Sequence, residues 1–275
     1  MPIVLISRGT MSGVRLLVGS ITEKYGYRSV SREDLIARVN EHGEIANRIV
    51  EHIGKATQAY DQFTQLRRPY VILMRLALLE YIRDDNVVYH GSSGHLLVPP
   101  MQHMLRVRIN APLAMRIHMT MDRLGCIEKV AREHIQAVDE ERRRWARFMY
   151  GRDIRDPQLY DVMVNLGRMP MHAVSAMLQC AVQDPDFVTQ PETKVEIDRL
   201  LLVTRIEASI ATEPRTSQFE IAAQVDDHRV KLIGPWLEEA ERELVLDITR
   251  PLVGDRSLEY VAGYEPVMEI PVKVE

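Results

Sequence analysis

The segment SRGTMSGVRLL, residues 7–17, has the residue types and the placement of a phosphate-binding loop. It follows the short apolar run 3–6 and leads into a helical pattern, and phosphate loops need this strand–loop–helix context. In the Walker pattern GxxxxGK[ST], Gly9 matches the first glycine, and the other key positions hold Val14, Arg15 and Leu16. Two interpretations remain open: an altered nucleotide site, or a Gly/Ser-rich turn that joins a strand to a helix.

A second candidate is the arginine-rich stretch VDEERRRWARFMYGR, residues 138–152. Phosphoryl transfer depends on cations that neutralise the transferred group, so these arginines could close over phosphates. The alternative is a solvated amphipathic helix with acid–base pairs at i,i+4 spacing, such as Glu140 and Arg144.

Other catalytic patterns are missing from the sequence. Cys126 and Cys180 are isolated, which argues against a zinc site or a disulfide framework. No HExxH, GxSxG or Cys/His arrangement occurs, and the nine histidines are scattered, so no metal site is predicted. Trp145 and Trp236 are expected to be packing residues rather than platforms for bases.

Composition narrows the class of protein. The net charge of -4 gives no reason to expect nucleic-acid binding, and the 46% hydrophobic content suits a globular chain with a core. No apolar stretch is long enough for a membrane span, and the N-terminus has no signal-peptide pattern. We therefore expect a cytoplasmic protein.

The elements that must position these residues alternate between strand and helix up to residue 183. Strands are predicted at 2–6, 84–91, 105–112 and 160–166, and helices at 12–25, 31–40, 44–56, 68–83, 113–150 and 171–183. A break is expected at Gly125, and Gly26 is expected to end the first helix in a left-handed conformation. Strands separated by helices predict an α/β fold with a parallel sheet.

The composition changes at QDPDFVTQPETK, and residues 184–194 are interpreted as a linker between domain 1–183 and domain 195–275. Beyond it the predicted order is helix 195–211, strand 218–225, strand 229–234, helix 237–249 and strand 257–264. This order indicates a small α+β domain.

Several dispersed motifs occur in one order along residues 1–183. They are VLISRGTMSGVRLLVGSITEKYGYRSVSREDLI, NVVYHGSSG, LRVRINAPLAMRI, AREHIQAVDEERRRW and DPQLYDVMVNLGRM. Together they resemble the cytidylate kinase-like family, a branch of the P-loop nucleoside monophosphate kinases. The resemblance implies a P-loop parallel-sheet domain that uses ATP with Mg²⁺ to phosphorylate a nucleoside monophosphate, cytidylate being favoured.

The resemblance also implies roles for single residues. Arg15 matches the arginine that the family carries in place of the Walker lysine, and an arginine can hold phosphate through a bidentate fork. The implied catalytic group is Arg15, Asp139, Arg142 and Arg143, the last three on a lid, where Arg132 is a weaker candidate. The implied donor site comprises Gly9, Thr10, Ser12, Gly13, Arg15 and Arg116. The implied acceptor site comprises Arg32, Asp34 and His90.

Three positions depart from the family pattern. Val14 replaces a glycine, so its branched side chain is expected to narrow the phosphate cradle. Leu16 has no hydroxyl for Mg²⁺, so no protein ligand for the metal is identified. His90 stands where members often have arginine; it could bind phosphate or could be an ordinary strand-end histidine, mostly neutral at pH 7.

The C-terminal part resembles a BON domain through a helix ending in ATEPRTSQFEI, the hairpin VDDHRVKLIGPW and a following helix and strand. That resemblance implies binding of a lipid, another small ligand or a partner protein. Two functions from different classes therefore remain: an ATP-dependent nucleoside monophosphate kinase, and a regulatory protein in which the kinase fold senses a nucleotide or phosphate. A third class of function is a purely structural interaction protein, which would bind no nucleotide.

Overall fold

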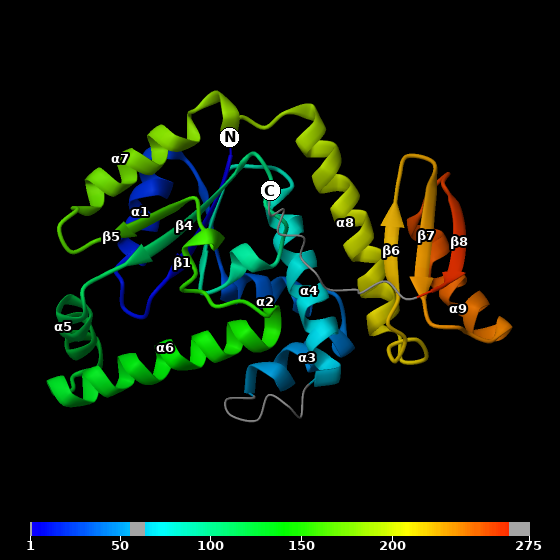
Figure 1. Cartoon of the computed structure of the whole chain (residues 1–275), viewed down its shortest axis with the longest axis horizontal. Coiled ribbons are helices and arrows are strands. Elements are labelled where there is room, and N and C mark those ends of the chain that lie inside the picture. Colours follow the sequence, from blue (N-terminus) through cyan, green and yellow to red (C-terminus); the bar gives the residue numbers. More distant parts are fainter. Residues whose placement is uncertain (1, 56–63, 264–275) are drawn as a thin grey trace. The chain divides into compact units, whose positions relative to one another are not determined.

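The computed structural model describes residues 2–55 and 64–263 (Figure 1). The chain forms two compact units, and each is built from two separate segments. Unit 1 contains Met1–Asp34 and Asp84–Gln190, and unit 2 contains Leu35–Arg83 and Pro191–Glu275. Residues 35–83 thus belong to the same unit as the C-terminal part, whereas the sequence analysis placed them in the predicted domain 1–183. The predicted boundaries 1–183, 184–194 and 195–275 stay a prediction.

Unit 1 is built on a parallel sheet of five strands in the order β2-β3-β1-β4-β5. The strands are β1 (Ile3–Arg8), β2 (Arg28–Ser31), β3 (Val87–Gly91), β4 (Met104–Asn110) and β5 (Val162–Asn165). Residues 3–6 of β1 are at most 2% exposed, as expected for a central strand covered on both faces. The predicted α/β fold with a parallel sheet is confirmed.

The chain leaves β1 towards β2 and leaves β4 towards β5, in opposite directions across the sheet. The loops that follow β1 and β4 therefore flank a topological switch point at the carboxyl edge of the sheet. Ligands of open α/β sheets bind at such points. The candidate phosphate loop lies there, directly after β1.

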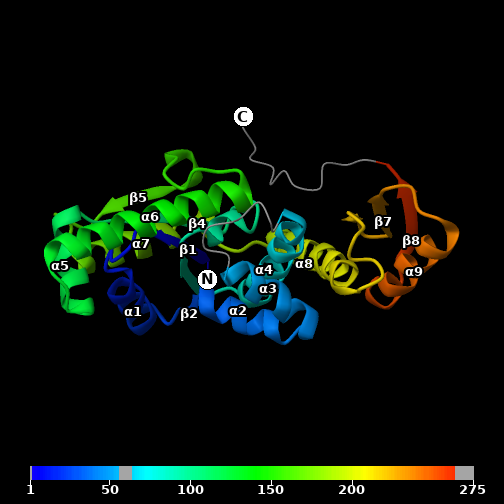
Figure 2. The ribbon, with the colours of Figure 1, turned by 90° about the horizontal axis from the view of Figure 1, so that it is seen from below.

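The helices of unit 1 cover the sheet and extend from it. They are α1 (Val14–Tyr25), α5 (Leu113–Leu124), α6 (Glu128–Tyr150) and α7 (Met171–Val182). α1 and α7 pack against each other and share one apolar core with β1, β3, β4 and β5. α5 and α6 also contact each other, and α6 runs back along the sheet (Figure 2).

Unit 2 combines helices with a three-stranded sheet of order β6-β7-β8. Its elements are α3 (Glu44–Lys55), α4 (Thr64–Ile82), α8 (Pro191–Thr212), β6 (Ala222–Val225), β7 (Arg229–Gly234), α9 (Glu239–Thr249) and β8 (Ser257–Ala262). β6 pairs antiparallel with β7, and β8 pairs parallel with β7. α8 packs on α4 and on β6. The helix α2 (Arg32–Asn40) begins in unit 1 and continues into unit 2.

Most predicted elements are present, with a few differences that have local causes. Gly26 and Gly125 adopt left-handed conformations and end α1 and α5, as expected. The strand β2 was missed because its sequence, RSVS, has only one buried apolar residue. β3 begins at Val87 rather than 84, since Asp85 and Asn86 form a left-handed turn with φ of 59° and 56°. The helix α8 begins inside the expected linker, at Pro191, a residue type suited to a first helical turn. Residue 56, the predicted end of the helix 44–56, and residue 264, the predicted end of the strand 257–264, lie outside the described residues.

Candidate active site

The loop of residues 9–13 turns the chain from β1 into α1. Gly13 has a φ of 78°, and an added Cβ there would lie 2.8 Å from Met171 Cε. Glycine is therefore required at Gly13, and Val14 is the first residue of α1, with a 2% exposed side chain in the apolar core. Val14 itself is helical, and the left-handed residues of this loop are Met11, with a φ of 54°, and Gly13.

Two side chains from the helices that follow β4 hold the backbone N–H and carbonyl of Thr10. Arg116 Nε donates to the Thr10 carbonyl at 2.6 Å, and Arg116 Nη2 donates to Asp139 Oδ2 at 2.6 Å. The Thr10 N–H in turn donates to Asp139 Oδ1 at 3.2 Å. We call Thr10, Arg116 and Asp139 the loop clamp. It joins the loop to α5 and α6 without using a residue of the sheet.

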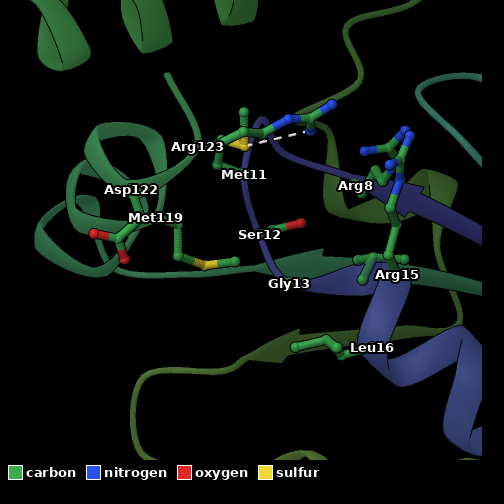
Figure 3. A pocket seen from close by; sticks show the side chains of 10 residues that line it. Arg8, Met11, Ser12, Gly13, Arg15, Leu16, Met119, Asp122 and Arg123 are labelled. Atoms are coloured by element: carbon green, nitrogen blue, oxygen red, sulfur yellow. Dashed lines mark hydrogen bonds between the residues drawn. The ribbon is translucent and has the colours of Figure 1, made fainter. Parts of the chain in front are cut away.

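A hollow of about 350 Å³ lies against the loop and the start of α1 (Figure 3). We call it the loop hollow; it is lined by Arg8, Met11, Ser12, Gly13, Val14, Arg15, Leu16, Met119, Asp122 and Arg123. Figure 3 shows the Arg15 and Arg8 side chains side by side, one from α1 and one from the end of β1. The buried Ser12 hydroxyl has no hydrogen-bond partner within the described residues. Anionic ligands fit this setting, since the N-terminus of α1 also lies at the hollow.

A second hollow, of about 420 Å³, lies between the end of β1, β4 and α6. We call it the arginine hollow; it is lined by Arg8, Gly9, Arg108, Gln136, Asp139, Glu140, Arg142, Arg143, Ile154 and Arg155. Arg8 lines both hollows, so the two are adjacent. The predicted lid residues Asp139, Arg142 and Arg143 are thus close to the loop.

Positive charge is concentrated around these hollows. Burial, reinforced by repulsion from Arg8, lowers the pKa of the Arg142 guanidinium to about 10. Burial and the nearby Arg15 likewise lower the pKa of Arg8. Bringing a negative group among these cations would relieve both effects, so the electrostatics favour an anionic ligand.

Residues 3–168, well over half of the chain, match the cytidylate kinase-like family. The chain belongs to that family. Its curated relatives include the cytidylate kinases of Pyrococcus horikoshii, 22% identical over 194 residues, and of Ignicoccus hospitalis, 27% identical over 177 residues. The first alignment covers 70% of this chain and 95% of the relative, and the second covers 63% and 95%.

Solved structures with similar folds include an uncharacterized protein from Eubacterium ventriosum, with a TM-score of 0.49 and 17% identity over 67% of this chain and 99% of that one. The thymidylate kinase of Candida albicans has a TM-score of 0.41 and 13% identity over 69% of this chain and 95% of that one.

The three acceptor residues implied by the family resemblance, Arg32, Asp34 and His90, line neither the loop hollow nor the arginine hollow. Asp34 accepts hydrogen bonds from the N–H and the hydroxyl of Ser31, both at 2.7 Å, and so caps α2. The Arg32 guanidinium lies 6.0 Å from the ring centre of Trp145. Burial, together with Arg8, lowers the pKa of His90, so this histidine is neutral near pH 7 and its buried Nδ1 has no described partner.

Two lid arginines are engaged in ion pairs along their own helix. Arg143 pairs with Glu140 at 2.5 Å, and Arg132 pairs with Glu128 at 2.8 Å. Arg144 is exposed, as the solvated-helix interpretation of the segment 138–152 expects, whereas Arg143 lines the arginine hollow and Arg142 is largely buried beside the loop.

Sequence reasoning missed two arginines that line the arginine hollow, Arg8 and Arg108. A signal for Arg108 was present in the strand 105–112, where Arg106, Arg108 and Asn110 alternate with apolar residues. Arg108 is only 8% exposed, so the middle of this strand's polar face is buried rather than solvated.

Within the described ranges, no group of three or more histidine, cysteine or carboxylate side chains could hold a metal ion. No helix in the same ranges has the length and apolar character needed to cross a membrane.

Proposed function

We propose that this protein transfers the terminal phosphoryl group of ATP to a nucleoside monophosphate, with cytidylate as the first candidate acceptor. Family membership and the names of its curated relatives support this activity. The observation that carries it is the convergence of the loop 9–13, Arg15 and the buried Arg142 at the switch point of the sheet. In-line transfer needs little beyond such positioning and charge neutralisation.

The residues around the loop suit the phosphates of the donor. Ser12 and Gly13 would supply backbone N–H groups, whereas the Gly9 N–H already donates to the Ile109 carbonyl at 3.3 Å. Arg15 lies in the first turn of α1 and adds a permanent positive charge. Thr10 and Arg116 shape the loop through the clamp, so we assign them to positioning rather than to direct phosphate contact.

The residues present fit ATP phosphates better than they fit a protein-held Mg²⁺. Leu16 is 67% exposed and offers no oxygen where Walker loops have a hydroxyl. The buried, unpartnered hydroxyls of Thr10 and Ser12 are oxygen donors within the loop itself. Mg²⁺ binds largely through substrate phosphates and water, so it would enter with the nucleotide and neutralise phosphate charge.

The test is ADP release from Mg-ATP with CMP, dCMP, UMP, AMP and GMP as acceptors. We expect acceptor-dependent turnover that Arg15→Ala abolishes or reduces at least about 100-fold, the scale for a group that stabilises charge in the transition state. Lys24→Ala is the matched control, since Lys24 is an exposed cation in the last turn of the same helix. No turnover with any acceptor would refute the kinase proposal.

A sensor of nucleotide or phosphate is the second candidate function. The absent hydroxyl at Leu16 and the Thr10 N–H already bonded to Asp139 favour it, because both weaken the case for rapid turnover. In this alternative ATP binds, Arg15→Ala removes that binding, and no acceptor is phosphorylated.

For unit 2 we propose a BON-like ligand-binding role for its C-terminal segment, supported by the element order α8-β6-β7-α9-β8. That order is the helix–strand–strand–helix–strand sequence on which the resemblance depends. Its ligand would be a lipid, another small molecule or a partner protein.

A further inference from the structure

The loop clamp brings a carboxylate to the loop of residues 9–13. Asp139 Oδ1 accepts from the Thr10 N–H at 3.2 Å, and Asp139 Oδ2 accepts from Arg116 Nη2 at 2.6 Å. A backbone N–H and a guanidinium are the kinds of donor with which proteins commonly hold a phosphate group. The Asp139 carboxylate therefore makes, at the edge of the loop, the two kinds of contact that an anionic ligand would make there.

The other acids that line the loop hollow and the arginine hollow make no such contact. They are Asp122 and Glu140. Asp122 lies 3.6 Å from His118 on its own helix. Glu140 pairs with Arg143 at 2.5 Å, also on its own helix. Asp139, by contrast, reaches from α6 to the backbone of the loop.

The Arg116 guanidinium lies against the loop in this contact. Its Nε donates to the Thr10 carbonyl at 2.6 Å, and its Cζ would lie 3.8 Å from a Cβ added to Gly9. The Arg116 side chain is only 14% exposed. A cation so close to the loop backbone is suited to neutralise a phosphate, but its Nη2 is already bonded to the Asp139 carboxylate. An anion that binds Arg116 through Nη2 must therefore replace that carboxylate.

The same carboxylate also offsets the charge of Arg142. Burial and repulsion from Arg8 lower the pKa of the Arg142 guanidinium, whereas Asp139 raises it. Asp139 thus supplies part of the negative charge that a ligand would bring to these cations. A ligand that meets cations already partly neutralised gains less from them.

We propose that the Asp139 carboxylate competes with phosphate groups for Arg116, so that the loop clamp is an autoinhibitory contact. A polyphosphate at the loop displaces the carboxylate from Arg116 and from the Thr10 N–H, and the two donors then face the phosphates. The assignment of Thr10 and Arg116 to positioning describes the clamped loop. We take the phosphates of ATP as the competing anion, and in this respect the proposal rests on the proposed function.

The family resemblance implies a catalytic role for Asp139, and the two roles predict opposite effects on binding when the carboxylate is removed. The test is calorimetric titration of the full chain with ATP and with tripolyphosphate, which has the phosphates without the nucleoside. We expect Asp139→Ala to tighten the binding of both ligands about 10-fold, because hydrogen bonds to a charged group no longer have to be broken. Asp139→Asn removes the charge and keeps an oxygen for the Thr10 N–H. It should give a gain of the same sign, and it decides the matter if Asp139→Ala does not fold.

Two controls separate competition from a general change of charge. Glu140→Gln removes the same charge one residue further along α6, from an acid that also lines the arginine hollow. It should change the affinity for ATP less than about 2-fold, as expected for an acid of an exposed ion pair. In an Arg116→Gln background, Asp139→Ala should give no gain, because the contested guanidinium is absent.

Urea unfolding supplies a readout that a purely structural role would not match. Asp139→Ala loses the clamp, so we expect it to unfold at a lower urea concentration than the wild type while it binds ATP more tightly. A residue that only holds the loop in shape would lower both the stability and the affinity.

The outcomes distinguish this contact from the proposed function. Binding that is unchanged or weaker in Asp139→Ala and Asp139→Asn would overturn the competition, and so would an equal gain in Glu140→Gln; neither result would touch the kinase proposal. Tighter binding in both Asp139 variants of a protein without turnover would support the competition while the kinase proposal fails. If neither the wild type nor these variants bind ATP or tripolyphosphate at millimolar concentration, both proposals are overturned.

Discussion

Gly13 is the single backbone position on which the loop geometry depends most. Its φ of 78° and the 2.8 Å approach of Met171 Cε to an added Cβ leave no room for a side chain. We predict that Gly13→Ala lowers the free energy of unfolding by about 1–2 kcal/mol, the cost of a left-handed non-glycine residue, or more if Met171 cannot move. The same variant should also weaken the binding of ATP. Urea unfolding and an ATP titration measure the two effects.

Gly19 is the matched control for that variant, because it lies within α1 and an added Cβ would meet nothing within 4 Å. Gly19→Ala should raise the free energy of unfolding by roughly 0.5–1 kcal/mol, since alanine is the better helix former. If both variants are equally stable, the strain assigned to Gly13 is wrong.

His95 makes the stability of the fold dependent on pH. It is 5% exposed, neither ring nitrogen has a described partner, and burial, aided by Arg108, lowers its pKa to about 3. The unfolded chain takes up a proton near pH 6.5 and the folded chain does not, so stability is full above 6.5 and falls as pH drops towards 3. The expected slope is about 1.4 kcal/mol per pH unit in that window.

His95→Phe should abolish the proton uptake by the unfolded chain at this position and keep a ring beside Tyr160. In the wild type the centroids of the two rings are 4.7 Å apart. Between pH 7 and pH 5 the wild type should lose about 2 kcal/mol more than the variant in urea unfolding. His118→Gln, which removes an exposed histidine, is the comparison variant. Identical slopes for the wild type and His95→Phe would contradict the assignment.

At the scale of elements, the loop clamp connects α5 and α6 to the loop. Asp139 accepts from both Thr10 and Arg116, and the Arg116 side chain is 14% exposed. We predict a coupling energy of about 1–3 kcal/mol between Asp139→Asn and Arg116→Gln in a double-mutant cycle on the free energy of unfolding. The reasons are the partly buried Arg116 side chain and the Thr10 backbone, to which both side chains bond.

The exposed pair Glu128–Arg132 on the same helix provides the reference cycle. Its coupling should be only about 0.3–0.5 kcal/mol, as for exposed pairs at i,i+4. A clamp coupling no larger than this reference would mean that the contact does not hold α6 to the loop.

The sequence predicts the alternating elements of unit 1 well, because its strands are short, apolar and separated by amphipathic helices. It also predicts that Asp139 and Arg142 lie near the loop, although only through the family resemblance. It cannot predict that the Asp139 carboxylate bonds to the Thr10 N–H, since this pairing joins residues 129 positions apart. Arg108 was missed because alternation in a strand does not show whether its polar face is covered.

At the scale of the whole chain, unit 2 depends on two segments far apart in sequence. Arg68 of α4 donates to the Ile221 carbonyl, ahead of β6. Glu207 of α8 is buried, which raises its pKa, and accepts from the Ala223 N–H at 3.3 Å. Arg68 and Arg75 act on the same carboxyl group. The sequence grouped α4 with the preceding strands because helix order alone does not reveal that α8 packs on it.

A chain that ends at Gln190 should therefore be much less stable than the full chain. Almost every residue from Pro69 to Leu79 of α4 is buried, and removal of α8 would expose part of that apolar surface. Each large apolar side chain that becomes exposed costs about 1.5–3 kcal/mol, so we expect a loss of roughly 10 °C or more in melting temperature. Adding residues 191–275 as a separate chain should restore part of it by refilling the face of α4. A truncated chain that melts cooperatively at the full-length temperature would show instead that α4 needs no partner from the C-terminal segment, and that the boundary at residue 183 marks an independent domain.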